Sequence, residues 1–188
     1  MNVYDFDGTI YNGDSTRDFF FYLLKNDFRV VKVLPAFGIS AIKCRFGILT
    51  KTKMKESFYR FLTLFKDGEI ASHVTNFWNK NRNKIYPWYY AVHDDKDVVI
   101  SASPRFILEP ICKELKVHLI CSEVNVNTGK YNGLNCHCEE KVNRFYKEYK
   151  DGIIDKFYSD LKIDLPLASL AKEAFLVKKG GKIIKWVL

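Results

Sequence analysis

The chain has 188 residues, enough for one domain of ordinary size or for a core domain with a modest insertion. Hydrophobic residues make up 47% of it and charged residues 28%, a globular composition that excludes disordered and fibrous proteins. The net charge of +8 favours anionic partners, and most of it lies in residues 28–60, where eight basic side chains and one acid, Glu56, give a charge of +7.

The cysteine content and the apolar runs bear on where the protein is found. The five cysteines are scattered, and the residues after Met1 lack the basic and then apolar pattern of a signal peptide. The longest uncharged apolar run, residues 33–42, is too short to cross a bilayer. We therefore expect a reduced, cytoplasmic protein.

The first element is a short strand that leads into a helical segment. Residues 2–4 are apolar and β-prone, and a polar turn, Asp5-Phe6-Asp7-Gly8-Thr9, follows at once. Apolar residues then recur with helical spacing, as in Phe19 and Leu23, and residues 14–85 have no strong strand signal. This stretch is predicted to be an inserted helical bundle.

Strands and helices alternate after residue 86. Such alternation predicts a parallel sheet with crossover helices. The expected order is a strand at 97–100, a helix beginning near Pro104, a strand at 117–120, a Gly-flanked hairpin at 127–133, a helix at 139–150, strands near 157–158 and 174–177, and a last apolar piece at 183–188.

Four polar features follow β-like runs or open a helix: Asp5-x-Asp7, Ser101, Lys141, and Asp160 with Asp164. Each alone has an ordinary structural interpretation, such as a helix cap, a turn or a solvated lysine. Together they supply carboxylates for Mg²⁺ and for nucleophilic attack, a second carboxyl for proton transfer, and a hydroxyl and a cation for phosphoryl oxygens. The carboxyl ends of parallel strands converge on one crevice, so we expect these residues to meet.

The same features resemble the ordered motifs of the haloacid dehalogenase-like hydrolases, in their phosphoserine-phosphatase-like branch. The resemblance spans nearly the whole chain and is carried by Asp5–Thr9, Ser101–Pro104, Cys138–Val142 and Tyr158–Pro166. It implies an α/β fold with a Rossmann-like, doubly wound, mainly parallel sheet. The catalytic core would comprise residues 1–13 and 86–188, with an all-helical cap at 14–85 and a small β-hairpin flap at 123–134.

The resemblance also implies a role for each motif residue. Asp5 would attack the phosphoryl group, and Asp7 would protonate the leaving oxygen and later activate water. Mg²⁺ would be held by the Asp5 side chain, the Asp7 carbonyl and Asp160. The catalytic set is completed by Ser101 and Lys141, which would bind or offset phosphoryl charge, and Asp164 would support Lys141 or a metal-bound water.

Substrate contacts are implied for Thr9, Asp14, Ala102 and Ser103. Asp14 aligns with an acidic residue that recognises the amino group of phosphoserine in members of the family. Asp14 could equally be the N-cap of the first helix. The fourth motif departs from the family pattern Gly-Asp-Ser, because Ser159 replaces the glycine and Leu161 the serine. Both acids remain, so we expect metal binding to survive with altered hydrogen bonds around it.

Two further clusters could suggest a metal site. Cys136-His137-Cys138 has no second ligand cluster, so a segment beside the flap is the better interpretation than a zinc site. His93-Asp94-Asp95 lies in a polar stretch before a strand, where solvated loop residues are usual.

The leading functional hypothesis is a Mg²⁺-dependent phosphomonoester hydrolase that acts through an aspartyl-phosphate on a small phosphorylated metabolite. The alternative is a peripheral-membrane lipid phosphatase resembling phosphatidylglycerophosphate phosphatases, because the basic segment at 28–60 flanks an apolar run and suits an anionic membrane surface. That segment could also be a solvated surface or could concentrate anionic substrate. A noncatalytic anion binder is the third candidate. No nucleic-acid partner is expected, since no aromatic and basic recognition motif is evident.

Overall fold

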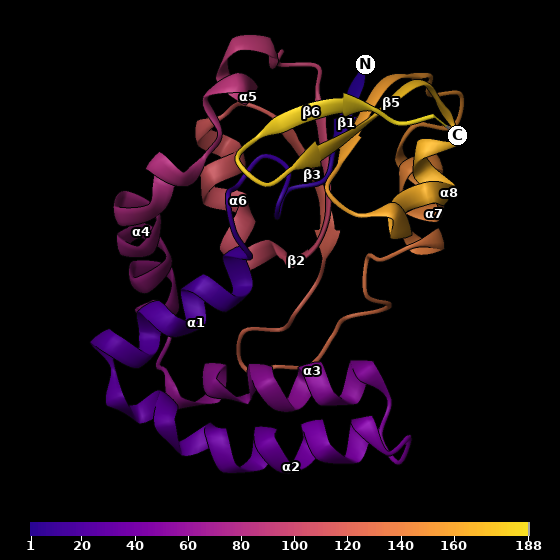
Figure 1. Cartoon of the computed structure of the whole chain (residues 1–188). Helices are drawn as coiled ribbons and strands as arrows, with labels where there is room; N and C mark the ends of the chain where they lie inside the picture. The colour runs from indigo at the N-terminus through magenta and orange to yellow at the C-terminus, as the bar shows by residue number, and fades with distance from the viewer. Residues whose placement is uncertain (188) are drawn as a thin grey trace.

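A six-stranded sheet forms the centre of the molecule (Figure 1). The computed structural model describes residues 1–187, and its strand order is β3-β2-β1-β4-β5-β6. All neighbouring strands are parallel except β5 and β6, which are antiparallel. The strands are β1 (Asn2–Tyr4), β2 (Val98–Pro104), β3 (His118–Ser122), β4 (Ile154–Ser159), β5 (Ala171–Lys178) and β6 (Lys182–Lys185). The predicted α/β fold with a mainly parallel sheet is therefore confirmed.

The central strand β1 is short but is held on both sides. Val3 pairs with Val98 of β2 and with Phe157 of β4. The amino group of Met1 forms a 2.6 Å ion pair with Asp155, just after the start of β4. These contacts fix the strand whose carboxyl end carries Asp5.

Successive residues of the strands point to opposite faces of the sheet, and each face has its own core. Val99 packs with Ile107 and Ile111 of α6 (Arg105–Glu114), whereas Val98 and Ile100 belong to the other core. That second core also holds side chains of α7 (Glu139–Glu148) and α8 (Leu165–Ala168). Helices thus cover both faces, as a doubly wound sheet requires.

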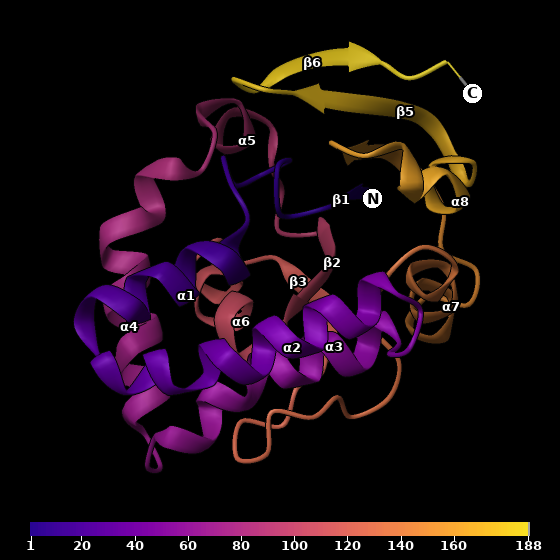
Figure 2. The ribbon, with the colours of Figure 1, turned by 60° about the horizontal axis from the view of Figure 1, so that its bottom comes forward.

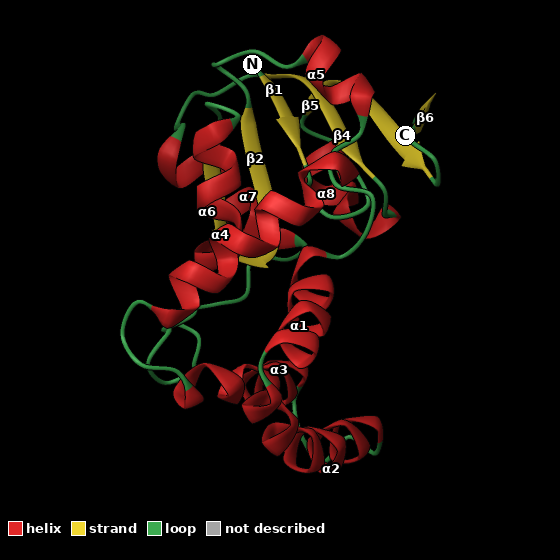
Figure 3. Cartoon of the chain, turned by 90° about the vertical axis from the view of Figure 1, so that its left-hand side faces the viewer, coloured by secondary structure: helices red, strands yellow, loops and turns green. Residues whose placement is uncertain are grey.

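The elements between the first two strands are all helical, and they lie in two places. They are α1 (Ser15–Asn26), η1 (Phe28–Val33), α2 (Leu34–Arg45), α3 (Lys51–Tyr59), η2 (Arg60–Leu64), α4 (Glu69–Asn81), η3 (Arg82–Lys84) and α5 (Pro87–Val92). Helices α2 and α3 lie side by side, farthest from the sheet (Figures 1 and 2). Helix α4 instead lies beside α6 (Figure 3), and Trp78 Nε1 donates a 2.7 Å hydrogen bond to the Ile107 carbonyl. The division into a cap at 14–85 and a core stays a prediction.

The predicted β-hairpin at 123–134 is a loop with a single antiparallel bridge, Val124 to Tyr131. Backbone hydrogen bonds from Asn125 N to the Lys130 carbonyl and from Asn132 N to the Glu123 carbonyl flank this bridge, so the segment is a short antiparallel hairpin without regular strands. The Asn125 side chain accepts hydrogen bonds from the Asn127 and Thr128 backbone, which stabilises the tight turn at the tip. No helix within residues 1–187 is long and apolar enough to cross a membrane.

The tip of this loop reaches helix α3 (Figure 1). Tyr131 N donates a 3.2 Å hydrogen bond to Glu56 of α3. Gly129 has a φ of +68°, and a Cβ at this position would lie 2.6 Å from the Tyr59 carbonyl oxygen. Only glycine therefore allows the loop to approach α3 so closely.

Candidate active site

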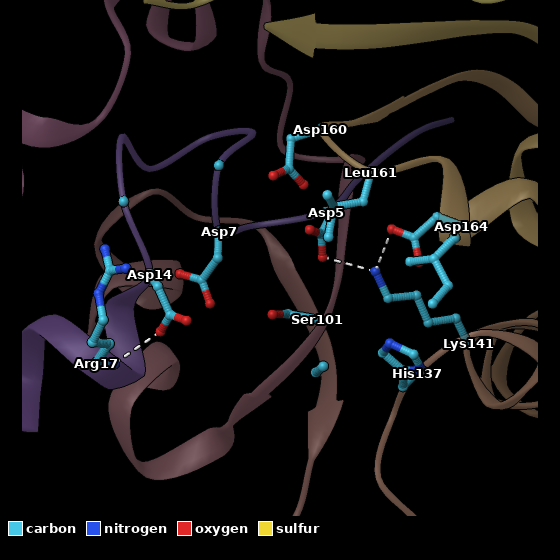
Figure 4. Close-up of a pocket in the computed structure, with 14 residues that line it drawn as sticks. Asp5, Asp7, Asp14, Arg17, Ser101, His137, Lys141, Asp160, Leu161 and Asp164 are labelled. Carbon is cyan, nitrogen blue, oxygen red and sulfur yellow. Dashed lines mark hydrogen bonds and ion pairs between the residues drawn. The ribbon is translucent and has the colours of Figure 1, made fainter. Parts of the chain in front are cut away.

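Side chains from the carboxyl ends of three neighbouring strands line a cavity of about 390 Å³. Asp5 follows β1, Asp160 follows β4, and Ser101 lies in the middle of β2. Figure 4 shows the Asp5, Asp7 and Ser101 side chains converging on the same space. The structure thus brings together the predicted residues Asp5, Asp7, Ser101, Lys141, Asp160 and Asp164.

Lys141 joins two carboxylates at one side of the cavity. It lies in the first turn of α7, and its Nζ is 2.8 Å from Asp5 Oδ1 and 2.8 Å from Asp164 Oδ2. Burial alone would lower the pKa of Lys141, but the two carboxylates raise it, so the ammonium stays charged. Burial raises the pKa of Asp5, and the Lys141 charge opposes that rise. Asp5 and Asp164 therefore share one buried cation.

Asp7 has a different environment on the opposite side of the cavity. Its Oδ2 accepts a 2.5 Å hydrogen bond from Ser103 Oγ, and its Oδ1 accepts a 2.7 Å bond from the Ser15 backbone N–H. Burial, and after it the nearby charge of Asp14, raises the pKa of Asp7 to about 6. Both hydrogen-bond donors are neutral, so this carboxyl group can carry or release a proton near neutral pH.

Asp160 and Gly8 together prepare a place for a cation. Gly8 has a φ of +73°, and a Cβ there would lie only 2.2 Å from Asp160 Oδ2. Asp160 Oδ1 is buried without a hydrogen-bond partner within residues 1–187, and burial raises the pKa of this carboxyl group. A buried carboxylate oxygen needs a compensating partner, and a divalent cation is one that fits.

The predicted ligands suit Mg²⁺, a small ion that takes oxygen ligands and keeps several waters. The set needs only two side chains, Asp5 and Asp160, with the backbone carbonyl of Asp7. Over the described residues 1–187, no group of three or more His, Cys, Asp or Glu side chains is arranged to hold a metal. The fit therefore depends on the carbonyl and on water, as the prediction assumed.

Ser159, which replaces a glycine of the family motif, is fully buried behind Asp164. Its Oγ lies 2.8 Å from Asp164 Oδ2 and 3.2 Å from the Leu161 backbone N–H, which donates to it. Leu161 replaces the motif's serine, and its side chain lies at the cavity wall. The predicted change of hydrogen bonding is thus an additional contact to Asp164.

The four residues predicted to touch substrate differ in position. Asp14 and Ala102 line the cavity. Asp14 is also the N-cap of α1, accepting a 2.8 Å hydrogen bond from the Arg17 backbone N–H, so both interpretations of it are compatible. The hydroxyl of Ser103 is turned to Asp7. Thr9 is fully buried and does not line the cavity, so the structure does not bring it to the site.

Two cavity residues with titratable side chains were not predicted from the sequence. His137 lines the wall near Lys141, and burial lowers its pKa. Its Nδ1 lies 2.9 Å from Cys138 Sγ, while Cys136 is buried in the core. Arg17 lines the opposite wall (Figure 4). Spacing was an available signal for Arg17, which stands three residues after the N-cap Asp14 in the first turn of α1. His137 lies before the N-cap of α7, so helical spacing does not predict its position.

Comparison with known proteins is consistent with this arrangement. The sequence matches the model of the haloacid dehalogenase-like hydrolase family over residues 3–169. No curated protein matches it. A protein of unknown function from Bordetella pertussis Tohama I has a similar structure, with a TM-score of 0.74 at 20% identity over 93% of this chain and 87% of that one.

Two further solved structures share the fold. A phosphoserine phosphohydrolase-like protein from Francisella tularensis subsp. tularensis SCHU S4 has a TM-score of 0.55 at 15% identity, over 93% of this chain and 86% of that one. A probable phosphoserine phosphatase from Vibrio cholerae has a TM-score of 0.58 at 12% identity, over 92% of this chain and 55% of that one. At these identities the similarity establishes the fold, and the match over residues 3–169 establishes the family. The chain therefore belongs to the haloacid dehalogenase-like hydrolases.

Proposed function

We propose that the chain is a Mg²⁺-dependent phosphomonoester hydrolase in which Asp5 is the nucleophile. The observation that carries the proposal is the pairing of one buried carboxylate, Asp5, with Lys141, while a second carboxyl group, Asp7, lies across the cavity with neutral donors. Phosphate transfer to a carboxylate and back to water needs this division of roles. Family membership and the similarity to two phosphoserine-phosphatase-like structures support the same reaction class.

Each side chain would have a defined part in the reaction. A carboxylate oxygen of Asp5 forms a bond to phosphorus as the bond to the leaving oxygen breaks, and Asp7 gives its proton to that oxygen. Asp7 then takes a proton from water, whose oxygen attacks the phosphorus and releases phosphate and free Asp5. Ser101 and Lys141 stabilise negative charge on the phosphoryl oxygens. When bound by Asp5, Asp160 and the Asp7 carbonyl, Mg²⁺ would add positive charge at the same oxygens.

The test is hydrolysis of a generic aryl phosphate with Mg²⁺ and with EDTA. We expect wild-type activity that EDTA removes and Mg²⁺ restores, and no activity for Asp5→Asn. Asp151→Asn is the matched control, because Asp151 is an exposed carboxylate that precedes β4 and does not line the cavity. Equal hydrolysis by the wild type and Asp5→Asn would show that Asp5 is not the nucleophile.

A further inference from the structure

A second cavity, of about 660 Å³, adjoins the first and is predominantly apolar. The two cavities share four wall residues, Asp7, Asp14, Arg17 and Ala102, so one opens beside the reacting groups of the other. The apolar wall is built by three helices, α1, α2 and α3. It includes Phe20, Leu24, Leu34, Phe37, Met54 and Phe58.

Seven of the fifteen residues that line this second cavity are polar or charged, and four of the seven lie at its junction with the catalytic cavity. Three of the four shared residues are polar or charged. The other polar or charged residues of its wall are Thr16, Lys55, Tyr59 and Ser103, and Ser103 donates a hydrogen bond to Asp7 at the junction. A ligand that fills both cavities would therefore have a charged end at Asp5 and Asp7 and an apolar body against α1–α3.

We propose that the substrate is the phosphate monoester of an alcohol with a long apolar chain, and that the chain lies in the cavity between α1, α2 and α3. This inference rests on the proposed phosphomonoesterase activity and assigns the leaving group of the same site. A pocket of this size and composition gains affinity by removing apolar ligand surface from water. A small polar leaving group such as serine would leave the apolar wall in contact with water.

The outer face of the same helices suits an amphiphilic substrate. Helix α2 contributes Leu34 and Phe37 to the cavity, yet none of its residues is buried. Its surroundings expose several large apolar side chains, namely Phe28, Ile39, Ile42, Phe46 and Ile48, of which Phe28 is 81% exposed and Phe46 73%. The basic residues Lys32, Lys43 and Arg45 lie among them. Apolar and basic side chains mixed on one surface are typical of contact with an anionic lipid interface, where such substrates are found.

The experiment measures kcat/KM for linear alkyl phosphates from ethyl to decyl, each below the concentration at which it forms micelles. We expect kcat/KM to rise by about two- to four-fold for each added CH₂ group until the cavity is filled. If short esters are hydrolysed in a way that depends on Mg²⁺ and Asp5, but kcat/KM does not rise with chain length, this inference is overturned and the proposed function stands. If no ester is hydrolysed in an Asp5-dependent way, the proposed function itself fails.

Two variants of the cavity wall test where the alkyl chain of the substrate binds. Phe37→Arg places a charge in the apolar wall and should bring the decyl-to-ethyl ratio of kcat/KM close to one. Met54→Trp fills part of the cavity and should move the optimum to a shorter chain. Ile153→Arg is the control, because it makes the same kind of change at an exposed position just before β4. It should keep the wild-type ratio. If the decyl-to-ethyl ratio of kcat/KM and the preferred chain length are unchanged in both cavity variants, the alkyl chain binds elsewhere.

Discussion

The hydroxyl of Ser159 donates a 2.8 Å hydrogen bond to Asp164 Oδ2, the same oxygen that accepts a bond from Lys141 Nζ. Because Lys141 also contacts Asp5, the four side chains form one continuous hydrogen-bonded chain from β4 to the nucleophile. A residue that breaks the family's glycine pattern therefore supports the charged groups of the site.

Removal of this hydroxyl should be measurable in both stability and activity. For Ser159→Ala we expect a loss of about 1.5–3 kcal/mol in the free energy of unfolding, the range for a hydrogen bond to a charged group, and a several-fold lower kcat/KM. Urea denaturation and initial rates give the two values. Ser169→Ala, whose exposed hydroxyl donates to the Leu165 carbonyl, is the control and should change neither strongly. Equal effects of the two substitutions would argue against a special role for Ser159.

Loss of the Lys141 charge should be more damaging. The Lys141 side chain is 3% exposed, and Lys141→Met would leave Asp5 and Asp164 buried without their shared cation. We expect about 3–5 kcal/mol of destabilisation at neutral pH, because both carboxylates lose their compensation. Lys147→Met, at an exposed position of the same helix, controls for helix effects. A loss of activity with unchanged stability would mean that the two carboxylates find other partners.

Gly8 and Gly47 have similar φ angles, so substitutions at the two positions distinguish the effect of backbone strain from that of a steric collision. Gly8 and Gly47 have φ values of +73° and +72°, but an added Cβ collides with Asp160 only at Gly8 and meets nothing within 4 Å at Gly47. Gly8→Ala and Gly47→Ala should each lose about 1 kcal/mol of stability from backbone strain. Only Gly8→Ala should raise the Mg²⁺ concentration required for half-maximal hydrolysis. A similar rise in Gly47→Ala would show that Asp160 displacement is not the cause.

The ion pair of Asp27 and Arg29 should make stability depend on pH. Side-chain hydrogen bonds from Arg29, including one of 2.6 Å, lower the pKa of Asp27. A lowered pKa in the folded state stabilises the protein above the unfolded value of about 3.9 and is lost as the pH falls through the folded value. The stability difference between the wild type and Asp27→Asn should thus be full at pH 7 and shrink in acid below about pH 4. A difference that stays constant down to pH 2 would contradict this assignment.

The apolar and basic surface around α2 should bind anionic membranes. We expect the protein to sediment with anionic phospholipid vesicles at low salt and to be released as salt screens the charges, whereas neutral vesicles should retain little. Ile42→Glu, at an exposed position of α2, should weaken the binding, and Ile153→Glu on the core should not. Sedimentation that is insensitive to salt and to Ile42→Glu would assign the binding to another surface.

That the candidate site residues would lie together was predictable, because strand ends and motif spacing are local properties of the sequence. Asp5, Ser101 and Asp160 each stand in or directly after an apolar run, and parallel topology then brings them together. His137 and Arg17 were missed because their inclusion depends on how the start of a helix faces the cavity, which requires the packed structure. The segment at 123–134 was predicted as a hairpin because its glycines suit one, and the structure has a short antiparallel hairpin there, with a turn that the Asn125 side chain closes. The apolar cavity is formed by three helices together, so no single segment of the sequence predicts it.

The contact between Gly129 and Tyr59 links a surface loop to the wall of the apolar cavity. The Tyr59 side chain lines that cavity, and its carbonyl oxygen would be 2.6 Å from any Cβ at position 129. A larger residue at the loop tip would therefore push the end of α3 and reshape the wall from outside. During evolution, changes at this single position, buried against the end of α3, could alter the range of substrates while the carboxylates of the candidate active site remain untouched.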